Sequence, residues 1–329
     1  MFHYIHHRRI AKYYFPSNRR PRLHDCTNYF FEIEQEDGLK QYGPSKEHRP
    51  NPIVEMGLFM DGDRIPLAFS IHAGNTNEQL TLKPLEEQII KDFSMSKFIV
   101  CTDAGLSSTN NRKFNNVNER SFITTQSIKK LKKHLKEWAL SSEGWLLERI
   151  AEKYDISQLE KSEESIEKYR NCTFYKERWI NEDAIIYESI YDGFYAVCTN
   201  LEDEAPAIAK INHNRWEIEE CFRIMKTDFK ARPVYLSRDD RIKAHFTTCF
   251  LALVIHRYLE KRLDNKYTSS NIINTLRNMN FFKVQTEEYI PTYTRTDLTD
   301  TLHETFDFRT DYQIISTTQM KKIFKSTKK

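Results

Sequence analysis

A short apolar run, Phe98–Thr102, ends at Asp103 and sets narrow limits on the fold of this chain. An unbroken apolar stretch of this length is typical of a strand that is buried on both faces, and such strands belong mainly to parallel sheets. Helices must then cover both faces of the sheet. With 329 residues, of which 39% are hydrophobic, the chain has ample material for such a core. The sequence therefore predicts an α/β fold.

Strand-like patterns surround this run in an order that indicates a mixed sheet. Alternating aromatic and β-branched residues predict a strand at 26–33, and a turn at Asp61–Asp63 separates two further runs. The predicted elements are strands at 26–33, 53–60, 64–72, 98–102 and 122–125, and helices at 81–93, 203–229 and 239–263. We expect the first three strands to form an antiparallel meander.

Composition excludes several classes of function. The 8 Gly include no G-x-G-x-x-G or G-x-x-x-x-G-K motif, which argues against glycine-rich nucleotide sites. The 6 Cys include no C-x-x-C pair, which argues against a zinc ribbon and favours a reducing cytosol. The longest apolar run, Phe246–Ile255, is too short to span a membrane, and the N-terminus lacks the apolar region of a signal peptide. The net charge is only +3, so the position of the charges matters more than their sum.

Shifts in composition divide the chain into five segments. They are a basic leader at 1–22, the first part of the core with both candidate aspartates at 23–126, a charged helical and β-strand insertion at 127–200, the second part of the core with a glutamate helix at 201–263, and a C-terminal helical region with a basic tail at 264–329. Within the insertion, we expect helix over 128–170 and strands at 173–180, 184–191 and 193–199.

Two aspartates and a glutamate are the candidate site residues. Asp25 stands at the start or in the middle of the first predicted strand and Asp103 at the end of the buried one, so their carboxylates meet if these two strands are neighbours. On the helix at 203–229, Arg215, Glu219 and Lys226 share one stripe at 100° per residue. Each feature alone has a simpler explanation, because strand-end aspartates often form turns and i,i+4 ion pairs often lie on solvated helix faces.

Taken together, the three acids would make an all-oxygen site. Such a donor set suits Mg²⁺, for which Mn²⁺ can substitute, rather than zinc. Two ions held by three carboxylates can carry out in-line phosphodiester chemistry. Arg215 and Lys226 beside the acids would hold DNA phosphates.

The motifs that carry these residues resemble those of the insertion-sequence DDE transposases. R-W-E-I-E-x-x-F-R-x-x-K at 215–226 fits the R-x3-E-x6-K part of the subgroup signature Y-x2-R-x3-E-x6-K. H-D-C-T-N-Y-F-F-E at 24–32 and C-T-D-A-G-L-S-S at 101–108 resemble the two aspartate motifs of the same family. The resemblance covers residues 23–263, and the three motifs occur in the family's order.

This resemblance implies a ribonuclease-H-like core with two Mg²⁺ ions, in which Asp25, Asp103 and Glu219 are the catalytic and metal-binding residues. The DNA-binding residues that it implies are Arg215, Arg223 and Lys226. The implied reaction is strand nicking at the ends of an insertion sequence, followed by transfer of the freed 3′-hydroxyl to target DNA. The implied partners are the terminal inverted repeats, target DNA and a second copy of the chain, and the implied location is the bacterial cytoplasm and its nucleoid.

The sequence departs from the family pattern at two places. Asn212 stands where the signature has Tyr, and only a short segment precedes Asp25, where family members usually carry a DNA-end-binding region. We therefore expect an N-terminally truncated transposase. The alternative is a catalytically idle fragment that binds DNA or a full-length partner. In either case, a Trp of the insertion (Trp138, Trp145 or Trp179) could stack on a displaced base, although a core role is the simpler explanation.

Overall fold

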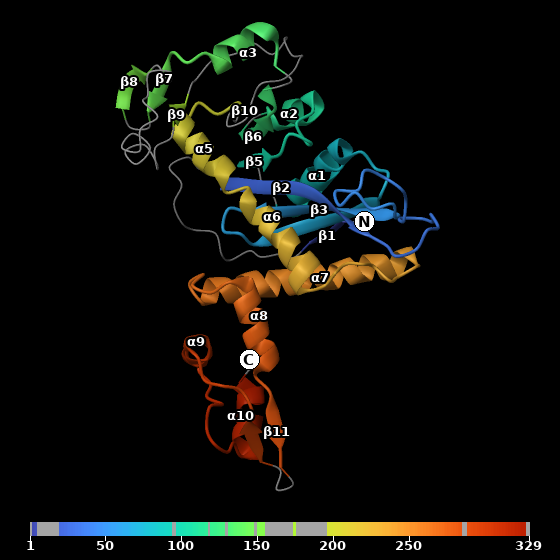
Figure 1. The fold of residues 1–329 in the computed structure, drawn as a ribbon, viewed down its shortest axis with the longest axis vertical. Helices are drawn as coiled ribbons and strands as arrows, with labels where there is room; N and C mark the ends of the chain where they lie inside the picture. The colour runs from blue at the N-terminus through green and yellow to red at the C-terminus, as the bar shows by residue number, and fades with distance from the viewer. Residues whose placement is uncertain are drawn as a thin grey trace. The chain divides into compact units, whose positions relative to one another are not determined.

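The computed structural model describes residues 2–4, 20–93, 97–117, 119–128, 131–147, 150–154, 174–175, 196–284 and 288–326. The chain forms two compact units, Met1–Glu220 and Cys221–Lys329. Figure 1 shows the course of the chain from its blue N-terminal strands to its red C-terminal helices. None of the helices in these ranges combines the length and the apolar composition needed to cross a bilayer.

The first unit is built on a mixed sheet, of which seven strands lie in the described residues, in the order β1-β4-β3-β2-β5-β6-β10. Their bounds are β1 Phe2–Tyr4, β2 Arg20–Phe30, β3 Ile53–Asp61, β4 Pro66–Ala73, β5 Phe98–Thr102, β6 Arg120–Gln126 and β10 Ala196–Thr199. The predicted antiparallel meander is confirmed as β2-β3-β4, and β5 is parallel to both β2 and β6. The central order β4-β3-β2-β5-β6 is that of a ribonuclease-H-like sheet, as expected.

Helix α1 (Leu82–Phe93) covers one face of this sheet. Leu82 packs with Cys26 of β2 and Phe98 of β5, and Leu85 packs with Phe59 of β3. Full burial of each large apolar side chain contributes about 1.5–3 kcal/mol. Because successive strand residues point to opposite faces, Cys26 faces α1 and its neighbour Asp25 faces away from it.

The turn between β3 and β4 is held by a single carboxylate. Oδ1 of Asp61 accepts hydrogen bonds from the backbone N–H groups of Asp63 and Ile65, each at 2.9 Å. Arg64 takes a left-handed conformation, with φ of 69°. This arrangement fixes the point from which the Arg64 side chain leaves the hairpin.

Part of the insertion that the sequence predicts as helix is strand. Helix α3 spans Lys133–Leu140, but β7 (Trp145–Leu147) and β8 (Ile150–Tyr154) then pair with β9 (Phe174–Tyr175), so the helix expected throughout 128–170 is wrong. The helix ends at Ser141, whose backbone is extended, with φ of −63° and ψ of 143°. The last predicted strand, at 193–199, corresponds to β10, which pairs with β6 of the main sheet. Most of the predicted leader, Trp179 and the strand at 184–191 lie outside the described residues.

The long helix predicted at 203–229 is interrupted. It consists of α5 (Ala205–His213), α6 (Trp216–Arg223) and a π-helical turn, η4 (Ile224–Asp228). Between α5 and α6 the backbone tightens to i→i+3 hydrogen bonds, from the N–H of Arg215 to Asn212 and from that of Ile218 to Arg215. A uniform 100° per residue therefore does not apply on either side of α6, and the stripe expected for Arg215, Glu219 and Lys226 stays a prediction.

The second unit is mainly helical. It contains α7 (Asp239–Arg262), α8 (Ser269–Asn278), the hairpin β11 (Phe281–Lys283) and β12 (Tyr289–Pro291), α9 (Asp297–Thr305) and α10 (Thr317–Ser326). The predicted helix at 239–263 is confirmed as α7. Leu263, Ile272, Leu298 and Leu302 form one of its apolar clusters.

Candidate active site

Asp25 occupies the middle of β2, on the face opposite α1. The residue is 8% exposed, and its Oδ1 accepts a hydrogen bond of 2.7 Å from the backbone N–H of Cys26. Strands β2 and β5 are parallel neighbours, with Leu23 opposite Cys101. The two strands are therefore neighbours, as the meeting of the two carboxylates requires. Asp25 and Asp103 each lie two residues beyond the Leu23–Cys101 pair.

Asp103 directly follows the last residue of β5. Its Oδ1 accepts a hydrogen bond of 3.0 Å from the N–H of Leu106, and its carbonyl accepts one of 3.0 Å from Oγ1 of Thr124. Oδ1 of Asp103 thus stabilises the turn, as strand-end aspartates often do. Its position is fixed from both sides, by the turn that it stabilises and by β6.

The charge of Asp25 depends strongly on its surroundings. Burial, and after it the nearby Asp103 carboxylate, raise the pKa of Asp25 to about 7. Lys46, the N–H of Cys26 and Arg215 act in the opposite direction. Two carboxylates in one site disfavour each other's charge, and a cation between them removes this penalty.

Arg215 links Asp25 to the glutamate helix. It lies in the break between α5 and α6, and its Nη1 is 3.8 Å from Oδ2 of Asp25. Its Nη2 is 3.3 Å from Oε1 of Glu219, one helical turn further on. Glu219 remains 59% exposed at its side chain. Asp25 therefore interacts electrostatically with Asp103, and the guanidinium of Arg215 links it to Glu219.

The other predicted side chains on these helices differ in environment. Asn212, at the position of the signature Tyr, accepts a hydrogen bond from the Cys101 thiol across 3.7 Å, so it faces the end of β5. Arg223 and Lys226 belong to the second unit, where Arg223 pairs with Asp228 at 3.2 Å.

Glu217, two residues before Glu219, forms a buried ion pair. The residue is 2% exposed, and its Oε1 is 2.8 Å from Nε of Arg64 in the β3–β4 turn. The same guanidinium lies over the ring of Trp216 at 5.7 Å. No local pattern in the sequence reveals this pairing, because the two partners are far apart along the chain.

Three more charged groups beside the aspartates escape the sequence motifs. Nζ of Lys46 lies 3.0 Å from Oε1 of Glu78 and donates to the carbonyl of Cys26. Burial lowers the pKa of Lys46, but Asp25 and Glu78 outweigh this effect and raise it overall. Burial, and after it Glu78, raise the pKa of Glu55 to about 8. Acidic groups thus extend beyond the three that the motifs identify.

These oxygens fit a hard divalent cation. The donors are carboxylates, which Mg²⁺ and Mn²⁺ prefer, and two of them are already close enough to raise a pKa. Gly105 leaves space next to Asp103, because a side chain there would have its Cβ 3.3 Å from both carboxylate oxygens. The residues present are therefore compatible with the metal chemistry that the sequence resemblance implies.

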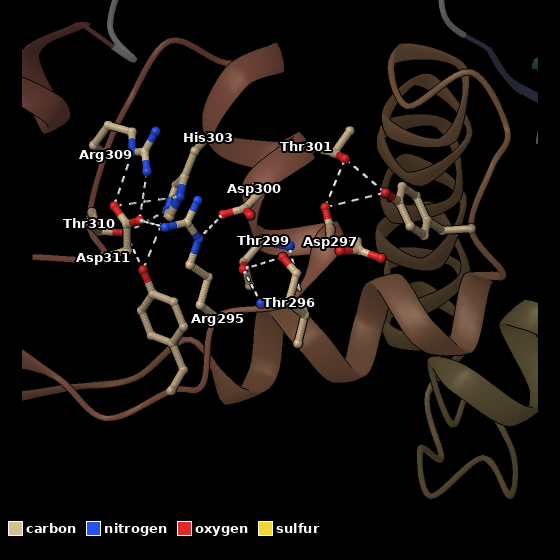
Figure 2. A network of polar contacts seen from close by, with 12 residues as sticks. Arg295, Thr296, Asp297, Thr299, Asp300, Thr301, His303, Arg309, Thr310 and Asp311 are labelled. Atoms are coloured by element: carbon tan, nitrogen blue, oxygen red, sulfur yellow. Dashed lines mark hydrogen bonds and ion pairs between the residues drawn. The ribbon is translucent and has the colours of Figure 1, made fainter.

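A second cluster of possible metal-ligating residues has a different character. In the second unit, one ligand atom each from Asp300, His303 and Asp311 lies within 4.8 Å of the others. Figure 2 shows that Arg295 and Arg309 reach into the same cluster. They approach Asp300 at 2.6 Å and Asp311 at 2.7 Å. Because two guanidinium groups already balance the two carboxylates, we assign this network to the stability of the region around α9.

The chain was compared with curated proteins and with solved structures. No curated protein matches the sequence. A solved structure of a piggyBac transposase synaptic complex with hairpin DNA, determined by cryo-EM, is 11% identical, with a TM-score of 0.45 over 78% of this chain and 51% of that one. The present chain thus spans about half the length of that transposase chain.

The family comparison covers most of the sheet unit and part of α7. The model of the transposase DDE domain matches residues 29–255, which include Asp103 and Glu219 and begin just after Asp25. This match spans well over half of the 329 residues. The chain therefore belongs to the transposase DDE domain family.

Proposed function

We propose that this chain is the catalytic domain of a DNA transposase that nicks DNA at the ends of an insertion sequence and transfers the freed 3′-hydroxyl to target DNA. One observation carries the proposal. Asp25 and Asp103 come from neighbouring parallel strands, and Arg215 joins Asp25 to Glu219 on α6. These contacts link three acids from distant parts of the chain, which supports the proposal in a protein of the transposase DDE domain family.

In this proposal Asp25, Asp103 and Glu219 hold two divalent ions, Mg²⁺ or Mn²⁺. When bound, such ions lower the pKa of an attacking water or 3′-hydroxyl and stabilise the leaving oxygen. The buried Asp25 is the central ligand, because it faces Asp103 on one side and Arg215 on the other. The exposed Glu219 contributes its carboxylate from α6, where DNA can approach.

Arg215 has two roles in this scheme. Before metal binds, its guanidinium compensates the charges of Asp25 and Glu219. With metal on these carboxylates, the guanidinium would be available for a DNA phosphate oxygen beside the scissile bond. Arg223 and Lys226 are proposed as further phosphate contacts, with double-stranded inverted repeats and target DNA as the ligands and a homodimer as the assembled form.

A nicking assay tests this function. The substrate is a supercoiled plasmid that carries the genomic DNA flanking the coding sequence, incubated with Mg²⁺ or Mn²⁺. We expect Asp25→Asn, Asp103→Asn and Glu219→Gln each to reduce nicking by about 100-fold or more, because each removes a carboxylate that would hold the metal ions acting on the reacting phosphate. Glu220→Gln, one residue further along α6, is the matched control and should retain activity.

Two outcomes would contradict the proposal. Full nicking activity in any of the three acid variants would remove that residue from the catalytic site. Binding of the same DNA by the wild-type chain without metal-dependent nicking would instead favour the alternative, an idle fragment that binds DNA or a full-length partner.

A further inference from the structure

Glu78 and Asp103 converge on one small space beside Gly105. An ideal Cβ on Gly105 would lie 3.3 Å from both carboxylate oxygens of Asp103 and also 3.3 Å from Oε2 of Glu78. The space is open only because residue 105 has no side chain. Two acidic groups from different parts of the chain therefore point oxygen atoms toward the same position.

The backbone around Glu78 is tied to the strand that carries Asp25. Glu78 begins a 3₁₀ turn, η1 (Glu78–Leu80), and its carbonyl accepts a hydrogen bond of 2.7 Å from Oγ1 of Thr81. The same hydroxyl lies 3.3 Å from Sγ of Cys26, the residue after Asp25. Thr81 thus links the backbone of Glu78 to β2.

Asn111 ties the same turn to the loop that carries Asp103. Its side-chain amide donates to the carbonyl of Gln79 at 3.0 Å and to that of Leu106 at 2.9 Å. The N–H of Leu106 in turn donates to Oδ1 of Asp103. Because Asn111 is only 6% exposed, this bridge is shielded from water, and the two carboxylates share one rigid frame.

The charges around this space leave room for a further cation. Oε1 of Glu78 is 3.0 Å from Nζ of Lys46, so Oε2 is the oxygen directed at Asp103. Glu55 hydrogen-bonds to Glu78 and is 4% exposed, and its Oε1 is buried without a hydrogen-bond partner among the described residues. One ammonium thus serves several acids, an arrangement that favours binding of a divalent ion.

We propose that Glu78 is a fourth metal-binding carboxylate, which shares with Asp103 a divalent ion, Mg²⁺ or Mn²⁺, in the space beside Gly105. The inference rests on the proposed function and extends its metal site beyond the three acids of the signature. Asn111 and Thr81 act as positioning residues for it, since they contact backbone groups rather than the ion.

The test measures Mn²⁺ binding to the full chain without DNA, by isothermal titration calorimetry. We expect Glu78→Gln to weaken Mn²⁺ binding by about 10-fold or more. Glu87→Gln is the matched control, because Glu87 is an exposed glutamate on the neighbouring α1 that pairs with Lys83. The Mn²⁺ affinity of this variant should stay at the wild-type value.

A second variant covers the case in which Glu78→Gln does not fold. Gly105→Ala places a methyl group 3.3 Å from the carboxylate oxygens and should also weaken Mn²⁺ binding, while far-UV circular dichroism stays native. Wild-type Mn²⁺ affinity in folded Glu78→Gln, or in folded Gly105→Ala, overturns the inference.

The same titration separates this inference from the proposed function. If Asp103→Asn loses Mn²⁺ binding while Glu78→Gln keeps it, only the role of Glu78 is wrong. If Asp103→Asn binds Mn²⁺ as the wild-type chain does, the metal site of the proposed function itself is wrong, and the role of Glu78 fails with it.

Discussion

Glu86 of α1 is a carboxyl group whose ionisation works against the folded state. The residue is 0% exposed, and Nδ2 of Asn115 donates a hydrogen bond of 2.8 Å to its Oε2. Burial raises the pKa of Glu86 from 4.5 to about 8, although the Asn115 contact opposes the shift. Because the folded-state pKa is the higher one, the stability associated with Glu86 is full below pH 4.5 and is lost as the pH rises toward 8.

Glu86→Gln should therefore flatten the dependence of stability on pH. A glutamine stays neutral, so the variant avoids the loss that wild type suffers between pH 5 and pH 8.5, on the order of a few kcal/mol. Urea unfolding at both pH values, for wild type, Glu86→Gln and the exposed control Glu87→Gln, measures the difference. An equal loss of stability in wild type and Glu86→Gln would show that Glu86 does not titrate in this range.

Among single residues of the candidate site, the sequence identifies those that lie in a recognisable motif and misses those that do not. Asp103 was identifiable because it ends an apolar run, and Glu219 because a helical signature surrounds it. Glu78 precedes a helix in an ordinary polar stretch, and Lys46 lies in a loop. Their relation to Asp103 and Asp25 arises only from tertiary contacts, which no local pattern encodes.

The start of α6 illustrates how one element is positioned by another. Arg64 leaves the β3–β4 turn, pairs with the buried Glu217 and covers Trp216. Glu217 stands two residues before Glu219, so this contact orients the turn of helix that carries the candidate catalytic glutamate. The Arg64 side chain is 45% exposed, so screening by solvent weakens its ion pair with Glu217.

Arg64→Ala should destabilise the protein by about 1–3 kcal/mol, because it withdraws a guanidinium from a buried carboxylate. In a double-mutant cycle, Arg64→Ala with Glu217→Gln should cost less than the sum of the single changes, since the neutral amide no longer needs a charged partner. Urea unfolding provides the free energies of all four proteins.

Lys133→Ala is the control for that cycle, because Lys133 pairs with Glu137 at 4.0 Å on an exposed helix face. This change should alter stability by less than about 1 kcal/mol. Strict additivity of the Arg64 and Glu217 changes would contradict a role for the pair in holding α6.

The strand meander and the buried strand were predictable as elements because alternation and apolar runs are local signals. The break at Asn214–Arg215 was not, because apolar spacing continues through it and asparagine only weakly disfavours helix. The break matters for the site, since it places Arg215 at the start of a new helix, within reach of Asp25. The strands β7 and β8 were missed because charged residues between them masked their short apolar runs.

For the whole molecule, the order of the elements predicted the mixed sheet correctly, and the order of the motifs predicted the family. The division into two compact units was less accessible. Its boundary falls inside α6, between Glu220 and Cys221, so the residues of one signature belong to both units. A continuous sequence motif carries no mark of such a boundary.

The central claim is that Asp25, Asp103 and Glu219 form one divalent-metal site. The most direct test is an anomalous difference map from crystals of the chain soaked in Mn²⁺. The account predicts anomalous peaks within coordination distance of Asp25 and Asp103, about 2.0–2.3 Å from their carboxylate oxygens, with Glu219 completing the site. Mn²⁺ bound only at Asp300, His303 and Asp311, with no peak beside Asp25 and Asp103, would contradict it.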